Sequence, residues 1–253
     1  MTDPQLITVH YLNLARRVDR RERFLKENQG LARFERVEGI VGAELCNEDL
    51  IRDRVIQEPL KKFTPGALGN ALSHKLLWER AASEQVVLTV AEDDALFNRS
   101  FAQKASGVLQ RLPADWDLIL WGWNMDSFLH VKLFGSLQDA VTTFDPLTLR
   151  QRIPAFREQA YDVVPLRLIG AFALVCYSVS PKGAKSLLEL CFPLTNESIF
   201  IRAIDRMVGN FAMSATMNRH YADLNAYACY PPLVYTENDR ADSDVITTRQ
   251  QSK

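Results

Sequence analysis

Hydrophobic residues in this chain fall into short continuous runs that are separated by polar or amphipathic segments. The runs at 86–90 and 117–123 are rich in β-branched and aromatic residues and show no strict alternation with polar positions. Such runs are typical of strands buried on both faces at the centre of an α/β sheet. The run at 168–179 predicts one long strand or a pair of strands. Shorter runs predict further strands at 6–12, 34–40, 211–217 and 226–234.

Several segments between these runs carry helical signals. Thr64 followed by Pro65 is typical of an N-cap with proline at the first helical position, and it predicts a helix that runs through Trp78. Gly66 and Gly69 each weaken that helix by up to about 1 kcal/mol relative to alanine. We therefore expect another backbone or a ligand to approach these glycines closely. Further helices are predicted from about Asp19, at 101–112, at 182–191 after Ser180-Pro181, and at 197–210.

Length and composition indicate one large domain. The chain has 253 residues, of which 47% are hydrophobic, enough for a single α/β core. We expect this domain to span residues 1–235 and to be followed by a polar, partly disordered tail at 236–253. Residues 124–165 have weak periodicity and several proline, aspartate and aromatic residues. They predict an irregular lobe of the kind that recognises substrates.

Charge and cysteine content exclude several classes of protein. The 30 basic and 31 acidic residues give a net charge of -1, which lacks the basic footprint of a nucleic-acid binder. The four cysteines form no CxxC pair, which favours a reducing compartment and argues against a zinc cluster. The longest apolar stretch is too short to span a bilayer, which needs about 20 residues. With no signal-peptide pattern at the N-terminus, we expect a cytoplasmic protein without a transmembrane segment, compatible with a peripheral position at a membrane.

Three consecutive acids, Glu92, Asp93 and Asp94, follow the buried run at 86–90. Strands of α/β sheets carry ligand sites at their carboxyl ends, and three neighbouring carboxylates there repel one another and lose hydration. A divalent cation such as Mg²⁺ or Mn²⁺ offsets this and usually takes one or two carboxylates together with substrate phosphates. We therefore expect the acids to gather in one pocket with a metal and a diphosphate. The alternative is a solvated surface turn or a cap for the following helix.

Two further groups of residues are candidates for ligand binding. Arg16 and Arg20 belong to a cluster of arginines after the first predicted strand, and guanidinium groups match phosphate oxygens in a bidentate fork. The alternative for these arginines is a solvated helix face. Ser73 and His74 lie in the helix that starts at Thr64. His74 shares its face with apolar residues, so a hydrogen-bonded core histidine is the alternative there.

Read together, these blocks resemble glycosyltransferase family 25, which includes bacterial lipo-oligosaccharide galactosyltransferases and the collagen galactosyltransferases. The resemblance runs from about Leu6 to Val234 and depends on the order and spacing of the blocks rather than on any one of them. The blocks are Asn13-Leu14 with the arginines after it, Gly66-x-x-Gly69-x-x-x-Ser73-His74, Glu92-Asp93-Asp94-Ala95, Gly170-Ala171-Phe172, Ser180-x-x-Gly183-Ala184, Asp205, and Pro231-Pro232-Leu233-Val234.

The resemblance implies a GT-A fold, which is a Rossmann-like central mixed sheet flanked by helices. It implies an inverting, metal-dependent transfer of a hexose, commonly galactose, from a UDP-sugar donor to a hydroxyl of a glycan or lipid-linked saccharide, as in lipopolysaccharide biosynthesis. On this mapping the acid triplet plays the part of the DxD motif, and Asp94 binds Mn²⁺ or Mg²⁺. The donor-binding positions that the resemblance implies are Asn13, Arg16, Arg20, Ser73, His74, Glu92 and Asp93.

Inverting transfer also needs a base for the proton of the acceptor hydroxyl, and such help is typically worth about 10²–10⁴-fold. Asp205, in the helix predicted at 197–210, falls where the family has an aspartate and is the candidate for this role. The alternative is a carboxylate paired with Arg202 or Arg206.

Two positions depart from the family pattern. Asn70 stands where the family often has cysteine, and the segment Asn196-Glu197 also differs from expectation. These departures leave open a catalytically inactive nucleotide-sugar or glycan-binding module of the same fold. Clustered acids would also suit a metal-dependent phosphohydrolase, which is the third candidate.

Overall fold

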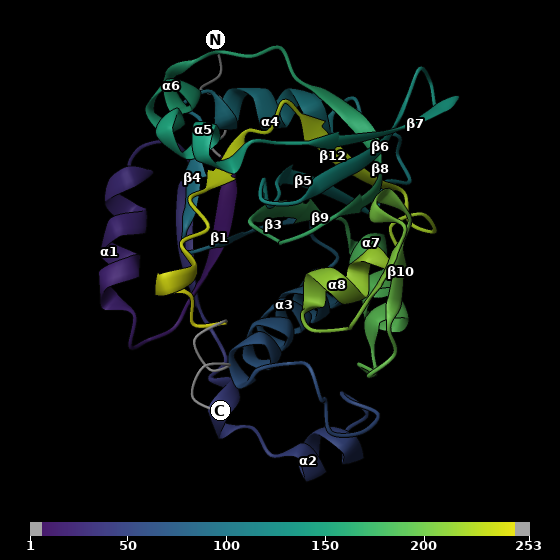
Figure 1. Ribbon diagram of the computed structural model, residues 1–253. Coiled ribbons are helices and arrows are strands. Elements are labelled where there is room, and N and C mark those ends of the chain that lie inside the picture. Colours follow the sequence, from purple (N-terminus) through teal and green to yellow (C-terminus); the bar gives the residue numbers. More distant parts are fainter. Residues whose placement is uncertain (1–6, 246–253) are drawn as a thin grey trace.

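A mixed sheet of nine strands lies at the centre of residues 7–245, the part of the chain that the computed structural model describes (Figure 1). In order across the sheet, the strands are β2 (Arg33–Glu38), β1 (Thr8–Asn13), β3 (Leu88–Glu92), β9 (Cys176–Val179), β5 (Leu118–Gly122), β12 (Ala226–Tyr230), β8 (Val164–Ala171), β6 (Phe128–Leu133) and β7 (Gln138–Thr143). β1 is parallel to β2 and β3, and β5 is parallel to β12, whereas β9 runs antiparallel between β3 and β5.

Helices cover both faces of this sheet, so the expected Rossmann-like, GT-A-like α/β architecture is confirmed. One face packs against α3 (Pro65–Glu84), α7 (Pro181–Cys191) and α8 (Met213–Asn218), and the other against α1 (Val18–Glu27) and α4 (Phe101–Leu109). The remaining elements are η1 (Gly42–Glu44), α2 (Asn47–Arg52), α5 (Pro146–Gln151), α6 (Ile153–Glu158), η2 (Arg202–Ile204), η3 (Arg240–Asp242), and the strand pairs β10 (Ile199–Ile201) with β11 (Arg206–Val208) and β4 (Ala95–Phe97) with β13 (Val234–Thr236).

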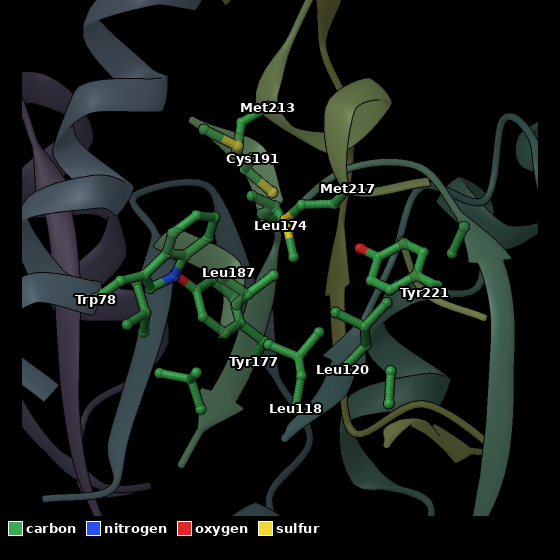
Figure 2. Packing of buried hydrophobic residues seen from close by; sticks show 14 of the residues in the cluster. Trp78, Leu118, Leu120, Leu174, Tyr177, Leu187, Cys191, Met213, Met217 and Tyr221 are labelled. Carbon is green, nitrogen blue, oxygen red and sulfur yellow. The ribbon is translucent and has the colours of Figure 1, made fainter. Parts of the chain in front are cut away.

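The central strands lack hydrophobic alternation because both of their faces are buried. In β5, Leu118 and Leu120 join the cluster that contains Trp78 of α3, as Figure 2 shows. Ile119 and Trp121, which point to the opposite face, join the cluster beneath α1 and α4. All four β5 side chains are fully buried. The prediction of doubly buried strands at 86–90 and 117–123 is confirmed, with the first strand shifted two residues toward its acidic end.

Helix α3 begins as its sequence predicts. The Thr64 side chain accepts a hydrogen bond from the Ala67 backbone N–H, and Pro65 occupies the first helical position. The close approach expected at the two glycines is also present. A Cβ added to Gly69 would lie 2.3 Å from the Ile40 carbonyl oxygen, and one added to Gly66 would lie 2.1 Å from the Asp244 carbonyl oxygen. Both glycines therefore allow other chain segments to lie directly on the helix.

Two local predictions are wrong. Residues 197–210 form the short hairpin β10–β11 around η2, and not a helix. Residues 211–217 do not form a strand, because α8 begins at Met213. Short apolar runs do not distinguish a buried strand from a buried helical turn, and the i, i+4 pair Met213 and Met217 places both side chains in the core beneath α3 and α7. The run at 168–179 divides into β8 and β9, which occupy separate places in the sheet.

The two segments expected to be irregular are more ordered than predicted. Within 124–165, β6 and β7 extend the central sheet, and α5 and α6 follow them. After β13, the described part of the tail, 237–245, continues through η3 to the start of α3, the yellow segment in Figure 1. The rest of the tail predicted to be disordered, 246–253, lies outside the described residues.

Every helix within residues 7–245 is too short or too polar to cross a membrane.

Candidate active site

A cleft of about 1400 Å³ opens where β1 and β3 end. These strands are parallel neighbours, with Leu12 opposite Glu92, so the residues that follow them meet at one edge of the sheet. The structure brings seven of the predicted donor and metal residues to the wall of this cleft: Asn13, Arg16, Arg20, Ser73, Glu92, Asp93 and Asp94. His74 lies behind this wall and is fully buried.

Asp93 is held from two sides. Arg20 Nη2 lies 2.6 Å from Asp93 Oδ1, and Asn13 Nδ2 donates a hydrogen bond of 2.7 Å to Asp93 Oδ2. Asn13 is itself oriented by Arg36, whose Nε donates to Asn13 Oδ1 at 3.1 Å. Burial raises the pKa of Asp93, while Arg20 and the hydrogen bond from Asn13 oppose that shift. Asp93 therefore fixes the end of β3 to the arginine cluster of α1.

Glu92 points toward α3. Asn70 Nδ2 donates a hydrogen bond of 3.0 Å to Glu92 Oε1, and His74 Nε2 lies 3.7 Å from the same oxygen. His74 Nδ1 lies 2.9 Å from the Tyr177 hydroxyl, which also accepts a hydrogen bond from the indole of Trp78. Burial would raise the pKa of Glu92, but His74 and Asn70 lower it below its usual value. Asn70, a position that departs from the family pattern, thus holds a carboxylate of the cleft.

Asp94 differs from its two neighbours because one of its oxygens is left unsatisfied. Asp94 Oδ2 accepts a hydrogen bond of 3.0 Å from Thr236 Oγ1, whereas the buried Oδ1 has no hydrogen-bond partner among the described residues. Arg20 Nη2 is 3.7 Å from Asp94 Oδ2. Burial, together with the nearby charge of Glu92, raises the pKa of Asp94 to about 6. A buried carboxylate oxygen without a donor is the atom in this cleft that a cation would satisfy.

The three acids line one cleft, but their carboxylates face three different elements. Within residues 7–245, no group of three or more His, Cys, Asp or Glu side chains is arranged to hold a metal ion. Glu92 faces α3, Asp93 faces α1, and Asp94 faces β13. The arrangement fits a cation held by one carboxylate and completed by substrate oxygens, which is a common way to bind Mg²⁺.

Ser73 lines the cleft with its hydroxyl already hydrogen-bonded, whereas Asp205 is not part of the described lining. Ser73 Oγ donates to the Gly69 carbonyl at 2.7 Å and accepts from the Ile40 backbone N–H at 2.8 Å, so it ties the loop after β2 to α3. Asp205 is exposed at the turn between β10 and β11 and is absent from the described lining of the cleft. The general-base role of Asp205 stays a prediction, and this position does not favour it.

The arginines at the start of α1, Arg16 and Arg17, face an acidic segment far away in the sequence. Arg16 Nη2 lies 2.7 Å from Asp244 Oδ1, and Arg17 Nη1 lies 2.6 Å from Asp244 Oδ2. Arg17 also pairs with Asp242. The hydrogen bond from Arg17 lowers the pKa of the exposed Asp19 to about 2. The opposite charges of the two segments are visible in the sequence. No residue pattern within either segment indicates that the two segments meet in the fold.

Another part of the cleft lining carries aromatic and acidic side chains. Phe172 and Phe211 stack with ring centroids 6.1 Å apart, and both border the cleft. Asp126 also borders it and receives hydrogen bonds from Arg150 at 2.9 Å and from Asn238 at 2.8 Å. Aromatic side chains and a fixed carboxylate in one cleft provide both apolar and polar contacts for a ligand.

A mixed sheet with a nucleotide-sized cleft at the ends of its parallel strands has the architecture of a Rossmann-like glycosyltransferase. The chain belongs to glycosyltransferase family 25 (LPS biosynthesis protein), whose pattern matches residues 7–207.

Two curated relatives from this family carry names that bear on activity. A region of 126 residues, 45% of this chain, is 30% identical to the probable inactive glycosyltransferase 25 family member 3 of Bos taurus. The corresponding region is 31% identical to the inactive glycosyltransferase 25 family member 3 of Homo sapiens. In each case the match spans 21% of the relative's length. Family membership therefore supports glycosyl transfer, while the activity of this chain is a separate question.

Proposed function

We propose that this protein is an active, inverting glycosyltransferase that transfers a hexose from a UDP-sugar to a hydroxyl of a glycan or lipid-linked saccharide. Galactose is the hexose that we propose. The observation that carries the proposal is the unsatisfied Oδ1 of Asp94, buried in a cleft that also contains a cluster of arginines. The family supplies the reaction class. The cleft supplies the opposite charges that a cation and a diphosphate require.

On this proposal, Asp94 would hold Mn²⁺ or Mg²⁺ through Oδ1. The metal supplies Lewis-acid neutralisation of the charge that develops on the leaving diphosphate. Thr236 orients Asp94 by donating to its other oxygen. Arg20 reduces the charge repulsion between Asp93 and Asp94 at the end of β3, because its guanidinium lies near both carboxylates. Arg16, just before α1, and Arg20, within it, then provide bidentate donors for the phosphates.

The rest of the cleft positions the two sugars. Glu92, held by Asn70, is available to accept hydrogen bonds from donor hydroxyls at the floor of the cleft. Phe172 and Phe211 provide a stacking surface for the acceptor, beside Asp126. Alignment of the acceptor hydroxyl with the anomeric carbon is the main contribution that such a rigid cleft makes to the rate.

The experiment that tests this function is release of UDP from UDP-galactose, UDP-glucose and UDP-N-acetylglucosamine, measured with Mn²⁺ and with EDTA. We expect slow Mn²⁺-dependent UDP release from at least one donor, because water substitutes for the acceptor when none is added. An increase in rate with saccharide acceptors would extend the result from hydrolysis to transfer.

The same experiment separates the alternatives. UDP binding without turnover of any donor would contradict the proposal and would favour an inactive binding module, in line with the names of the two relatives. Phosphate release from a simple ester such as p-nitrophenyl phosphate, without UDP release, would favour a phosphohydrolase.

A further inference from the structure

The segment 237–245, which we call the C-terminal strap, crosses the cleft and is fastened at both ends. At its beginning, Arg150 Nε donates to the Glu237 carbonyl at 2.7 Å, and Asn238 Nδ2 donates to Asp126 Oδ2 at 2.8 Å. At its far end, Thr64 Oγ1 donates to the Val245 carbonyl at 2.6 Å. Figure 1 shows the strap passing α1 on its way to the start of α3. The strap therefore joins the acceptor wall of the cleft to the donor wall.

The strap approaches α3 at Gly66, where only a glycine fits. A Cβ at this position would lie 2.1 Å from the Asp244 carbonyl oxygen. The glycine that the sequence marked as unfavourable inside a helix thus allows the strap to lie on the first turn. This contact places the acidic part of the strap next to α1.

Four arginines contact the acidic part of the strap, three through the carboxylates of Asp242 and Asp244 and one through a backbone carbonyl. Asp244 binds Arg16 at 2.7 Å and Arg17 at 2.6 Å, and Asp242 binds Arg17. Arg23 Nη2 lies 3.4 Å from Asp242 Oδ2, and Arg20 Nη1 lies 3.3 Å from the Asp242 carbonyl. The side chain of Arg17 is 16% exposed and that of Asp244 is 24% exposed, so this pair is partly shielded from water. Such a network is stronger than isolated surface pairs.

These arginines include Arg16 and Arg20, the predicted ligands of the donor diphosphate. Carboxylate and phosphate oxygens use the same guanidinium N–H groups, since both fit the bidentate fork of arginine. Asp242 and Asp244 already occupy N–H groups of Arg16 and Arg17. A diphosphate that takes these donors must displace the two aspartates.

We propose that the C-terminal strap is a built-in competitor for the diphosphate group of the donor: it occupies the arginines in the free protein and leaves them when a diphosphate binds. This inference rests on the proposed function for the identity of the donor. The competition for the arginines itself requires only a diphosphate group. The strap begins directly after Thr236, which holds Asp94, so its displacement opens the cleft beside the proposed metal ligand. The apparent affinity for diphosphate then equals the intrinsic affinity multiplied by the fraction of molecules in which the strap is open.

The test compares the affinity of pyrophosphate for three full-length proteins: wild type, Asp242→Asn/Asp244→Asn, and a matched control, Glu237→Gln/Asp239→Asn. Each variant loses two negative charges from the strap, and asparagine at 239 keeps the ability to cap η3. We expect pyrophosphate to bind about tenfold more tightly to Asp242→Asn/Asp244→Asn, because the competing pairs are weakened. The control is expected to stay within about twofold of wild type, since long-range charge is screened by salt.

Amide hydrogen exchange of residues 239–245 in the wild-type protein is a second test of whether the strap is displaced. Exchange there is expected to speed up when pyrophosphate is added. Unchanged or weaker pyrophosphate affinity in Asp242→Asn/Asp244→Asn, or slower exchange in the strap, would overturn the proposal and show that the strap does not compete. If pyrophosphate displaces the strap but UDP with Mn²⁺ binds no better than pyrophosphate, the strap proposal stands and the proposed donor fails.

Discussion

Asp94→Asn is expected to abolish sugar transfer and at the same time to make the metal-free protein more stable at neutral pH. The variant removes the charge that would hold the cation, and metal stabilisation of a leaving diphosphate is worth several kcal/mol, or about 10³-fold or more in rate. UDP release from the best donor with Mn²⁺ is the measurement. Asp162→Asn, which removes a fully exposed carboxylate outside the cleft, is the control and should retain full activity.

The stability change follows from the raised pKa of Asp94. Because its folded-state pKa is about 6 and a free aspartate has a pKa near 4, the folded protein binds this proton more tightly than the unfolded chain. The resulting stabilisation is fully present below about pH 4 and is lost as the pH rises through 6. In EDTA at pH 7, Asp94→Asn should therefore unfold with a free energy about 2–3 kcal/mol higher than wild type. Near-normal activity, or a loss of stability at pH 7, would contradict the role given to Asp94.

Arg20→Ala is expected to destabilise the protein by about 3–5 kcal/mol, because it leaves buried acids without their cation. The Arg20 side chain is 12% exposed and lies 2.6 Å from Asp93. Urea unfolding at pH 7 measures the loss. Arg23→Ala is the matched control: its side chain is 49% exposed and its pair with Asp242 is 3.4 Å long, so its removal should change stability by about 1 kcal/mol or less.

A second variant keeps this prediction informative if Arg20→Ala unfolds. Arg20→Ala/Asp93→Asn removes both members of the closer pair, so that only Asp94, 3.7 Å from Arg20, still loses its neighbouring cation. It should recover a large part of the lost stability. Equal losses for Arg20→Ala and Arg23→Ala, or no recovery in the double variant, would show that Arg20 does not balance the acids of the cleft.

The fold was predictable where local signals agree with burial. The run at 86–90 and the Thr64-Pro65 pair identified β3 and α3, because a doubly buried strand and a capped helix have distinct residue patterns. Residues 197–217 were assigned incorrectly, since three-residue strands and a six-residue helix are too short for periodicity to separate. Their structure depends on packing against α3, α7 and β6 rather than on their own pattern.

The sequence predicted which residues line the candidate site better than it predicted their hydrogen bonds and ion pairs. The acid triplet lies at the end of β3 and Arg20 lies in the helix that follows β1, so their meeting at one edge of the sheet follows from the parallel pairing of β1 and β3. Sequence patterns did not show that Arg17 binds Asp242, because the two residues are 225 positions apart and meet only in the folded chain. For the same reason, the pattern gave no sign that Thr236 orients Asp94.

The most direct test of the central claim is the affinity of wild type and Asp94→Asn for UDP, measured by calorimetry with and without Mn²⁺. If a cation on Asp94 shares the cleft with the diphosphate, Mn²⁺ should tighten UDP binding at least about tenfold in wild type, a coupling of about 1.4 kcal/mol, and should have little effect in the variant. Equal UDP affinity with and without Mn²⁺ in wild type, or an undiminished Mn²⁺ effect in Asp94→Asn, would contradict it.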